Sequence, residues 1–515
     1  MNTEPEERWW RGAVIYQIYP RSFADSDGDG VGDLDGVTGR LDHLVDLGVD
    51  ALWLTPINPS GGADGGYDVT DYTDVDPVYG DLAAFDRLVH AAHQRDLRVL
   101  VDIVPNHTSD RHPWFIESRS SRSNARRDWY VWADGREGGT APPNNWVSTF
   151  AGPAWSSDAR TKQWFLTSFY PEQADLNWEN PEVRAALTGA MRFWRERGAD
   201  GFRIDVVQRL SKDPLLRDNP PPADDAEWAA TGRYDEDGPL GPARIAEVRR
   251  ALGDDVLLLG EVWVLEVERT YRYVGPGLLD LAFAFPFAMA PWNPRLLMTV
   301  VEQIERLTAA DGRLPTYHLS NHDTPRAGTR FGPGTVRAAL TMLLTLRGTP
   351  VLYQGDELGL LDTPVPSERA VDRVGRDGAR TPMPWDASPN AGFTGSEAEP
   401  WLPIGEHATT NVASQAEDPD SVLALCRRLI ALRRRSDALR RGRCGFVAAT
   451  RHFLTYLREA GNERYLVALN FNDTPEEVPV QPGLVEVAST RDLEHGRVRH
   501  SVQLPAFGAA VIRLD

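Results

Sequence analysis

The sequence predicts an α/β protein built on a (β/α)8 barrel, with a small domain inserted after the third strand and an antiparallel β domain towards the C-terminus. Three observations predict this fold. Apolar, strand-like segments alternate with helical patterns through most of the chain, the alternation breaks once between about residues 108 and 170, and only short strands follow residue 442. Apolar strands that alternate with amphipathic helices are typical of parallel β/α units.

The first three β/α units lie before residue 107. Their expected strands are the apolar runs Ala13–Pro20, Ala51–Pro56 and Val99–Val104. Between the first two strands, apolar residues at helical spacing end at Gly48, which can stop a helix. Before the third strand, Asp81 can cap a helix whose apolar residues fall on one face. The pattern therefore predicts three strands with a helix between each pair.

The alternation breaks over residues 108–170, which are rich in Trp, Gly, Pro, Asn and Arg. A structureless loop of this length is improbable in a compact domain, so we predict an inserted domain. Asn180 and Pro181 then form a good start for a helix. Together with the first three, the later strands make eight, the number that closes a barrel. These later strands are Gly201–Val206, Val256–Trp263, Leu278–Phe285, Thr316–Ser320 and Val351–Tyr353.

The chain changes character after Gly442, where short alternating strands follow one another without helices. The expected strands are Phe453–Leu457, Tyr465–Asn470, Glu477–Val480 and Ala509–Leu514. A run of strands without helices indicates a separate antiparallel β domain. We therefore expect a barrel formed by residues 1–107 and 171–441, an inserted domain over 108–170 and a C-terminal β-sandwich over 442–515.

The amino-acid composition excludes some classes of binding partner. The formal net charge of −20 argues against nucleic acid or an anionic membrane surface, because both are bound through basic patches. The acidic stretch Met1–Arg11 lacks a signal-peptide pattern, and no apolar run reaches the roughly 20 residues that span a bilayer. We expect a cytoplasmic monomer or homodimer with a neutral small-molecule substrate. Cys426 and Cys444 have no metal or redox spacing, and we expect free thiols, with one disulfide as the alternative.

Ionisable residues gather where several predicted strands end. In a (β/α)8 barrel the carboxyl ends of the strands meet at one face, where reactive groups lie. A single aspartate at such a position can equally be a cap or an ion-pair partner, but many together indicate an active site. The residues concerned are Asp102, Asn106, His107, Arg203, Asp205, Glu261, Asn321, His322 and Asp323.

The two central carboxyl groups can divide the work of acid–base and nucleophilic catalysis. Arg203 and Asp205 are two residues apart on one strand, so their side chains face the same side. A guanidinium there is expected to hold Asp205 ionised, as a nucleophile requires. Glu261 lies one strand away, which is compatible with the carboxyl separation of about 5–5.5 Å in retaining glycosidases. Crowded by other carboxylates, Glu261 is expected to hold its proton more tightly, which suits a general acid.

Four segments carry a family resemblance. They are Asp102-Ile-Val-Pro-Asn-His107, Gly201-Phe-Arg-Ile-Asp205, Gly260-Glu-Val262 and Ser320-Asn-His-Asp323. In order and spacing they resemble the four sequence regions of the α-amylase family. The resemblance extends over nearly the whole chain and includes the inserted domain and the C-terminal β domain.

The resemblance implies a double-displacement reaction through a covalent β-glucosyl-enzyme. Asp205 would be the nucleophile and Glu261 the acid/base, and Asp323 would bind sugar hydroxyls in the transition state. Three further residues, Arg203, His107 and His322, would complete the pocket for the reacting glucose.

Within the family, the chain resembles the oligo-1,6-glucosidase and α-glucosidase branch. Gln173-Ala-Asp-Leu-Asn177 resembles a signature of that branch, with Ala174 where proline is usual. In similar exo-acting enzymes the residues matching Asp64 and Arg380 clamp the non-reducing sugar, and Tyr67 stacks beneath it. Phe169 resembles an aromatic wall of the pocket. The alternatives are a loop salt bridge for Arg380 and a core position for Phe169.

The activity that this branch implies is a retaining exo-α-glucosidase, which releases glucose from short α-glucosides and transfers it to other acceptors. Val206, directly after the nucleophile, is often found in relatives that accept α-1,6 bonds, and Ser211–Asn219 resembles α-glucosidases that act on short oligosaccharides. Three alternatives stay open: a glucosyltransferase or isomerase such as trehalose synthase or sucrose isomerase, a trehalose-6-phosphate hydrolase, and a catalytically inactive binding protein. The retained carboxyl groups disfavour the last.

An acidic loop near the N-terminus predicts a metal site. Its carboxylates occupy alternate positions of the first nine residues of an EF-hand-like loop, although the closing glutamate is replaced by Gly36. Such clustered carboxylates repel one another without a cation, and similar loops in oligo-1,6-glucosidase relatives hold Ca²⁺. We expect a structural Ca²⁺, with Mg²⁺ or a solvated acidic turn as alternatives. The expected ligands are Asp25, Asp27, Asp29, the Val31 carbonyl and Asp33.

Overall fold

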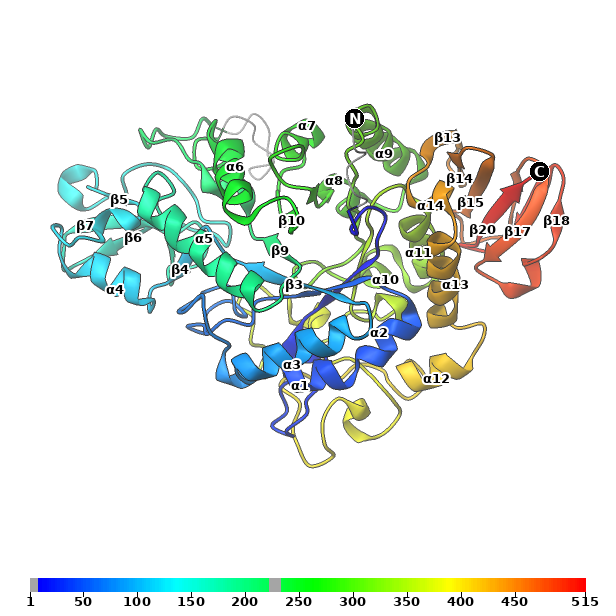
Figure 1. Cartoon of the computed structure of the whole chain (residues 1–515), viewed down its shortest axis with the longest axis horizontal. Helices are drawn as coiled ribbons and strands as arrows, with labels where there is room; N and C mark the ends of the chain where they lie inside the picture. The colour runs from blue at the N-terminus through cyan, green and yellow to red at the C-terminus, as the bar shows by residue number, and fades with distance from the viewer. Residues whose placement is uncertain (1–7, 222–232) are drawn as a thin grey trace. The chain divides into compact units, whose positions relative to one another are not determined.

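The computed structural model describes residues 8–221 and 233–515 of the chain (Figure 1). The acidic stretch that begins at Met1 lies mainly outside these residues. Contacts divide the chain into two compact units, each assembled from separate segments. The first unit contains Met1–Trp53, Arg87–Arg98 and Phe283–Asp515, and the second contains Leu54–Asp86 and Val99–Ala282.

The second unit is built on a parallel sheet whose strands follow one another in the order β3-β9-β10-β11. All residues of β9 and β10 are buried, as expected for strands covered on both faces. Helix α5 precedes β9 and begins as predicted, with the Asn180 side chain accepting from the Glu182 N–H and Pro181 in the first turn. The strands are β3 (Arg98–Ile103), β9 (Gly201–Ile204), β10 (Leu257–Gly260) and β11 (Leu281–Ala282).

The first unit contains the remaining parallel pairs. Strand β1 (Ile15–Ile18) pairs in parallel with β12 (Val351–Tyr353). Single parallel bridges join Phe283 to Thr316 and His318 to Val351. The segment predicted as a strand over 316–320 is therefore strand-like, although it forms only isolated bridges. With β2 (Ala51–Leu54), the described residues contain all eight strand positions of the predicted (β/α)8 barrel, in the predicted order.

The α-helices alternate with these strands. One helix, α3 (Leu82–His93), contains residues of both units. The others are α1 (Leu34–Gly39), α2 (Leu41–Leu47), α4 (Pro113–Ser120), α5 (Pro181–Glu196), α6 (Gly241–Leu252), α7 (Val267–Tyr271), α8 (Phe285–Ala288), α9 (Pro294–Thr308), α10 (Ala327–Phe331), α11 (Val336–Thr345), α12 (Val412–Glu417), α13 (Val422–Arg434) and α14 (Asp437–Arg440).

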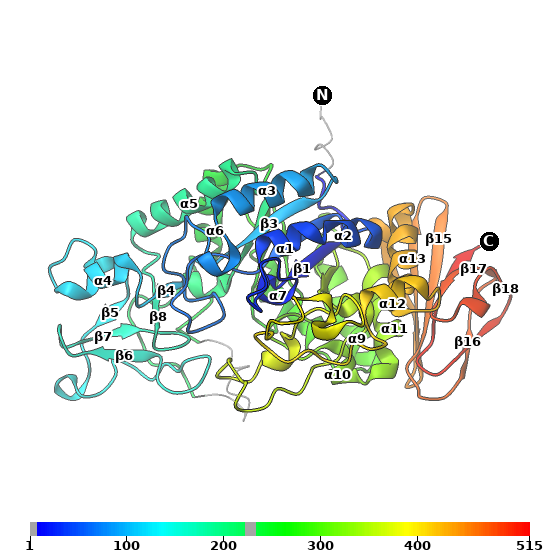
Figure 2. The ribbon, with the colours of Figure 1, turned by 90° about the horizontal axis from the view of Figure 1, so that it is seen from below.

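The segment that follows β3 forms its own small sheets and one helix, α4 (Figure 2). Three short strands pair antiparallel in the order β5-β7-β6, and β4 pairs with β8. Trp146, Ala154, Trp155 and Leu166 pack together as a local core. The strands are β4 (His107–Ser109), β5 (Trp132–Ala133), β6 (Trp155–Asp158), β7 (Gln163–Leu166) and β8 (Gln173–Asp175).

The C-terminal strands form a six-stranded sheet in the order β13-β14-β15-β20-β17-β18 and a two-stranded sheet of β16 and β19. Apolar residues of both sheets, including Leu466, Val478, Val502 and Ile512, share one core. Residues 441–515 contain no α-helix, which agrees with the predicted β domain. The strands are β13 (Arg443–Ala449), β14 (Phe453–Ala460), β15 (Glu463–Asn470), β16 (Glu476–Pro479), β17 (Gly483–Ala488), β18 (Arg497–Val498), β19 (Ser501–Leu504) and β20 (Ala509–Leu514).

Two further sequence-based expectations concern membranes and disulfides. Within the described residues, no helix has the length and apolar character required to traverse a bilayer. Cys426 and Cys444 are both free thiols, and Cys426 is buried in α13.

Truncation of the C-terminal core tests its contribution to stability. Leu466 is fully buried in β15, so Leu466→Ala leaves a cavity and should lower the free energy of unfolding by about 2–5 kcal/mol. The matched control is Val447→Ala in β13, where the side chain is exposed and the expected change is within about 0.5 kcal/mol. Urea unfolding followed by fluorescence measures both, and equal effects would contradict the packing described.

Candidate active site

The register of the parallel strands β3, β9 and β10 places the candidate catalytic residues of the second unit at the same end of the sheet. Asp102 of β3 pairs with Arg203 of β9, and Ile204 of β9 pairs with Gly260 of β10. Asp205 and Glu261 are each the first residue after their strand. Both therefore lie at the carboxyl ends of neighbouring parallel strands, where active-site groups of β/α proteins are found.

The Arg203 guanidinium joins three carboxyl groups. Its Nη1 lies 2.9 Å from Asp102 Oδ1 and 2.6 Å from Asp205 Oδ1, and its Nη2 lies 2.9 Å from Glu261 Oε2. The Arg203 side chain is 1% exposed, and the three acidic side chains are nearly as buried. The structure thus brings together four of the six residues of this unit that were predicted from their positions at strand ends.

The charges of this cluster do not balance. Burial raises the pKa of Asp205 well above its usual range, and the neighbouring Glu261 and Asp102 raise it further, although Arg203 acts to lower it. A hydrogen bond with Glu261 also favours the protonated form of Asp205. This differs from the expectation that Arg203 keeps Asp205 ionised. One guanidinium does not offset burial together with two nearby carboxyl groups, so the protonated form of Asp205 is favoured.

Tyr67, His107 and Asp64 extend this cluster. The Tyr67 hydroxyl donates to Asp102 Oδ2 at 3.0 Å, and the Arg203 guanidinium lies 5.7 Å from the centre of the Tyr67 ring. His107 Nε2 lies 3.1 Å from the Tyr67 carbonyl oxygen. The Gln173 side-chain amide donates to Asp64 Oδ2 at 3.0 Å. Burial lowers the pKa of His107, so this ring is neutral at pH 7.

Phe169 lies against His107, with ring centres 5.0 Å apart. Its other neighbour is Phe150, at 5.7 Å. Both phenylalanines are half-buried, as an aromatic wall beside a pocket would be. Phe150 could not be predicted from the sequence, because the inserted segment has no periodicity that assigns its residues to a face.

The segment Gln173–Asn177 contacts His107 and the residues around it. Asp175 is fully buried and accepts hydrogen bonds from the Ser168 N–H at 2.8 Å and from Lys212 Nζ at 2.9 Å. In β8, Asp175 also pairs with His107 of β4. Lys212 Nζ donates in addition to Asn106 Oδ1 at 2.8 Å. The sequence analysis missed Lys212, since a single lysine in a loop carries no pattern.

The first unit holds the other candidate residues, His322, Asp323 and Arg380. Asp323 Oδ1 accepts hydrogen bonds from Arg380 Nη2 and from Arg376 Nη1, each at 2.9 Å. Arg380 Nε also donates to the His322 carbonyl oxygen at 2.7 Å. Arg376 was missed by the sequence analysis, although it stands only four residues before Arg380. Two arginines thus hold one carboxylate in place, which favours its ionised form.

The His322 ring is oriented by residues from β1 and the segment after it. Gln17 Nε2 lies 2.7 Å from His322 Nδ1, and the Tyr19 ring stacks on the imidazole at 6.0 Å. An amide Nε2 is a donor, so Nδ1 is assigned as the acceptor and Nε2 carries the proton. That Nε2 lies 3.2 Å from Asp323 Oδ2. The contact aligns His322 and Asp323 as one unit.

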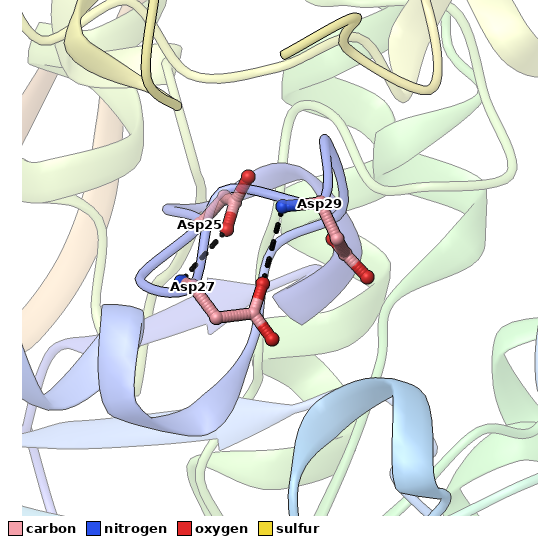
Figure 3. A group of neighbouring side chains, drawn as sticks. All are labelled: Asp25, Asp27 and Asp29. Carbon is pink, nitrogen blue, oxygen red and sulfur yellow. Dashed lines mark hydrogen bonds between the residues drawn. The ribbon is translucent and has the colours of Figure 1, made fainter. Parts of the chain in front are cut away.

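The acidic loop of the first unit gathers three carboxylates. Oxygens of Asp25, Asp27 and Asp29 lie within 4.8 Å of one another (Figure 3). Slight desolvation and the charges of the neighbouring Asp29 and Asp25 raise the pKa of the exposed Asp27. Oxygen ligands at this spacing suit a hard divalent cation.

Asp33 and Val31, the other two predicted ligands, make hydrogen bonds within the same loop and at the start of α1. The Asp33 carboxylate accepts from the Ser26 N–H and from the Gly36 N–H, each at 2.7 Å, and so caps α1. The Val31 N–H donates to Asp29 Oδ1 at 2.8 Å. Asp33 therefore serves the helix start, and the three carboxylates nearer the N-terminus form the cluster.

Comparison with known proteins identifies the family. The family model for the α-amylase catalytic domain matches residues 17–442. A probable α-glucosidase of Rhizobium meliloti is 41% identical, with 99% of this chain and 98% of the relative covered. An oligo-1,6-glucosidase of Parageobacillus thermoglucosidasius is 36% identical, with 91% of each chain covered. A trehalose-6-phosphate hydrolase of Bacillus subtilis is also 36% identical, with 96% of each covered.

Solved structures agree with this match. An α-glucosyl transfer enzyme, XgtA, superimposes with a TM-score of 0.93 at 38% identity, covering 99% of this chain and 100% of its own. A trehalulose synthase, MutB, superimposes with a TM-score of 0.92 at 32% identity, covering 98% of this chain and 100% of its own. The chain therefore belongs to the α-amylase family of glycoside hydrolases, in the branch of the oligo-1,6-glucosidases and α-glucosidases.

Proposed function

We propose that this glycoside hydrolase is a retaining, exo-acting α-glucosidase that releases glucose from the non-reducing end of short α-glucosides. We also propose that it transfers glucose to other acceptors. The observation that carries the proposal is the pair Asp205 and Glu261, held by one buried arginine at the ends of adjacent strands. Retaining glycosidases require two carboxyl groups at close range, one as nucleophile and one as acid/base.

The hydrogen bond between the two carboxyl groups offers a route to the reactive protonation state. Transfer of the proton from Asp205 to Glu261 leaves Asp205 ionised and Glu261 protonated. Asp205 then attacks the anomeric carbon while Glu261 gives its proton to the glycosidic oxygen, and the C–O bond breaks with its electron pair leaving on that oxygen. A covalent β-glucosyl ester and the released alcohol result.

In the second half of the reaction, Glu261 takes a proton from a water molecule while the oxygen of that water attacks the anomeric carbon. The ester bond breaks, Asp205 regains its charge, and glucose is released with its configuration retained. A sugar hydroxyl in place of water gives transglucosylation by the same steps. In this proposal Asp323, Arg203, His107 and His322 bind the reacting glucose, as in similar enzymes.

Exo action rests on the family resemblance of Asp64, Tyr67 and Arg380, with Phe169 as an aromatic wall. The Asp64 contact with Gln173 supports it, because that amide fixes the carboxylate. Val206 after the nucleophile favours acceptance of α-1,6 bonds. The similarity to a trehalulose synthase and to a glucosyl transfer enzyme makes an isomerase or glucosyltransferase the second candidate. A trehalose-6-phosphate hydrolase is a third, and it would require basic residues for the phosphate.

A time course of products separates these candidates. With maltose, isomaltose, maltotriose, sucrose and trehalose 6-phosphate at equal concentration, we expect glucose as the main early product of maltose and isomaltose. Asp205→Asn should lower kcat by at least about 10⁴-fold, because no covalent ester forms. Asp254→Asn, an exposed aspartate before β10, is the matched control and should keep normal turnover. If the products are new disaccharides with little glucose, the enzyme is a transferase or isomerase. Full activity of Asp205→Asn would contradict the proposed mechanism.

The pH profile reports the raised pKa of Asp205. Asp205 must be ionised to attack, so kcat/KM should fall as the pH drops through a value well above the usual aspartate range of about 4. In Glu261→Gln, the loss of the neighbouring carboxyl removes one cause of the raised pKa. The acidic limb of that variant should therefore lie at lower pH, measured with 4-nitrophenyl α-glucoside. An unmoved acidic limb would show that the two groups do not interact.

We further propose that Asp25, Asp27, Asp29, the Val31 carbonyl and Asp33 hold a structural Ca²⁺, with the first three as the central carboxylates. Hydrogen bonds to Asp25 from the Thr394 hydroxyl and from the Gly28 and Gly30 N–H groups lower its pKa against partial burial, so it is ionised and ready to bind. A bound cation would stabilise the fold at this loop, and Mg²⁺ is the alternative ion.

Thermal unfolding with and without Ca²⁺ tests the site. A cation that binds only the folded chain raises Tm, by an amount equivalent to about 2.7 kcal/mol at 100 times Kd. Asp27→Asn should abolish the shift, whereas Asp46→Asn, an exposed aspartate of α2, should keep it. A shift with Mg²⁺ alone would change the identity of the ion, and equal shifts in both variants would place binding elsewhere.

A further inference from the structure

Val206 has an unusual backbone. Its φ of 36° and ψ of 52° place it in the left-handed region. Among the described residues with positive φ, it is the one β-branched residue. A β-branched side chain clashes with its own backbone there, so such a residue persists only where its surroundings impose the conformation. Val206 directly follows Asp205 and is itself buried.

The conformation creates a bulge between β9 and β10. Glu261 N–H donates to the Ile204 carbonyl at 2.8 Å, as in a regular parallel ladder. The next bond of the ladder, to the Glu261 carbonyl, is made by Val207 N–H at 2.8 Å. Two residues, Asp205 and Val206, thus lie opposite the single residue Glu261. Bulges of this kind re-aim groups beside active sites.

The bulge leaves the Val206 N–H free of the ladder and directs it to a side chain. That N–H donates to Glu261 Oε2 at 3.1 Å. The same oxygen lies 2.9 Å from Arg203 Nη2. Two donors on Oε2 favour negative charge on that oxygen, so the proton of the neutral carboxyl resides on Oε1.

We propose that the Val206 backbone N–H is the positioning donor for the acid/base, that the strained bulge is kept for this contact, and that Glu261 Oε1 is the oxygen that transfers the proton. This inference rests on the proposed role of Glu261. Val206 acts through Glu261 and is a positioning residue.

The contact has a chemical consequence in both half-reactions. When the Oε1 proton moves to the glycosidic oxygen, the O–H electron pair remains on the carboxylate, and the Val206 N–H and Arg203 meet the new charge at Oε2. When Oε1 later takes a proton from water, the carboxylate becomes neutral, and the negative charge that the two donors faced at Oε2 is removed. The N–H therefore stabilises the deprotonated acid/base and holds the carboxyl plane in one orientation.

An amide-to-ester replacement at residue 206 tests the donor. Incorporation of 2-hydroxy-3-methylbutanoic acid keeps the valine side chain and removes only the N–H. We expect kcat/KM for isomaltose to fall about tenfold, the effect of one hydrogen bond to a charged group. For 4-nitrophenyl α-glucoside the fall should be much smaller, because this leaving group departs without protonation.

The matched control is the same replacement at Val207, whose N–H bonds to the Glu261 carbonyl. It weakens the same bulge without touching the carboxylate, so both substrates should be affected equally. Equal losses on both substrates for the residue 206 ester would overturn the inference.

Glu261→Gln separates this inference from the proposed function. If Glu261 is the acid/base, this variant loses far more activity on isomaltose than on the aryl glucoside. If its losses are equal, the proposed function itself fails. If Glu261→Gln discriminates and the residue 206 ester does not, only the role of Val206 is wrong.

Discussion

The proposed catalytic residues of the second unit depend on one buried ion cluster around Arg203. Transfer of a guanidinium and several carboxyl groups from water to the protein interior is costly, and the cost is recovered only where the groups meet in good geometry. Here the parallel register of β3, β9 and β10 supplies that geometry, because Asp102, Asp205 and Glu261 all reach the same guanidinium. Any shift of one strand would separate the charges, so the site and the sheet stabilise each other.

The cluster also influences which of its carboxyl groups carries a proton. Three acids share one fixed positive charge, and the raised pKa of Asp205 follows from that imbalance together with burial. A nucleophile and an acid that exchange one proton are a workable starting state for a retaining glycosidase. The bulge at Val206 gives Glu261 a second fixed donor, which distinguishes its two oxygens.

Residues proposed to bind the substrate are held by others further back. Asp175 pairs with His107 and is itself held by Lys212, so the segment Gln173–Asn177 supports the position of His107. In the first unit, Gln17 fixes the His322 ring. Such supporting contacts reduce the freedom of the reactive side chains and define their geometry.

The sequence by itself determined the eight strand positions and the candidate residues at their ends, because apolar runs and their termini are local features. It did not determine the strands of the inserted segment, where short aromatic stretches lack a period. Only the tertiary structure showed that three further residues lie near the candidate site, namely Lys212, Arg376 and Phe150. Their partners lie far along the chain, or their role depends on exact placement. The same holds for Asp33, which caps a helix, and for the protonation of Asp205, which depends on burial and on charges brought by neighbouring strands.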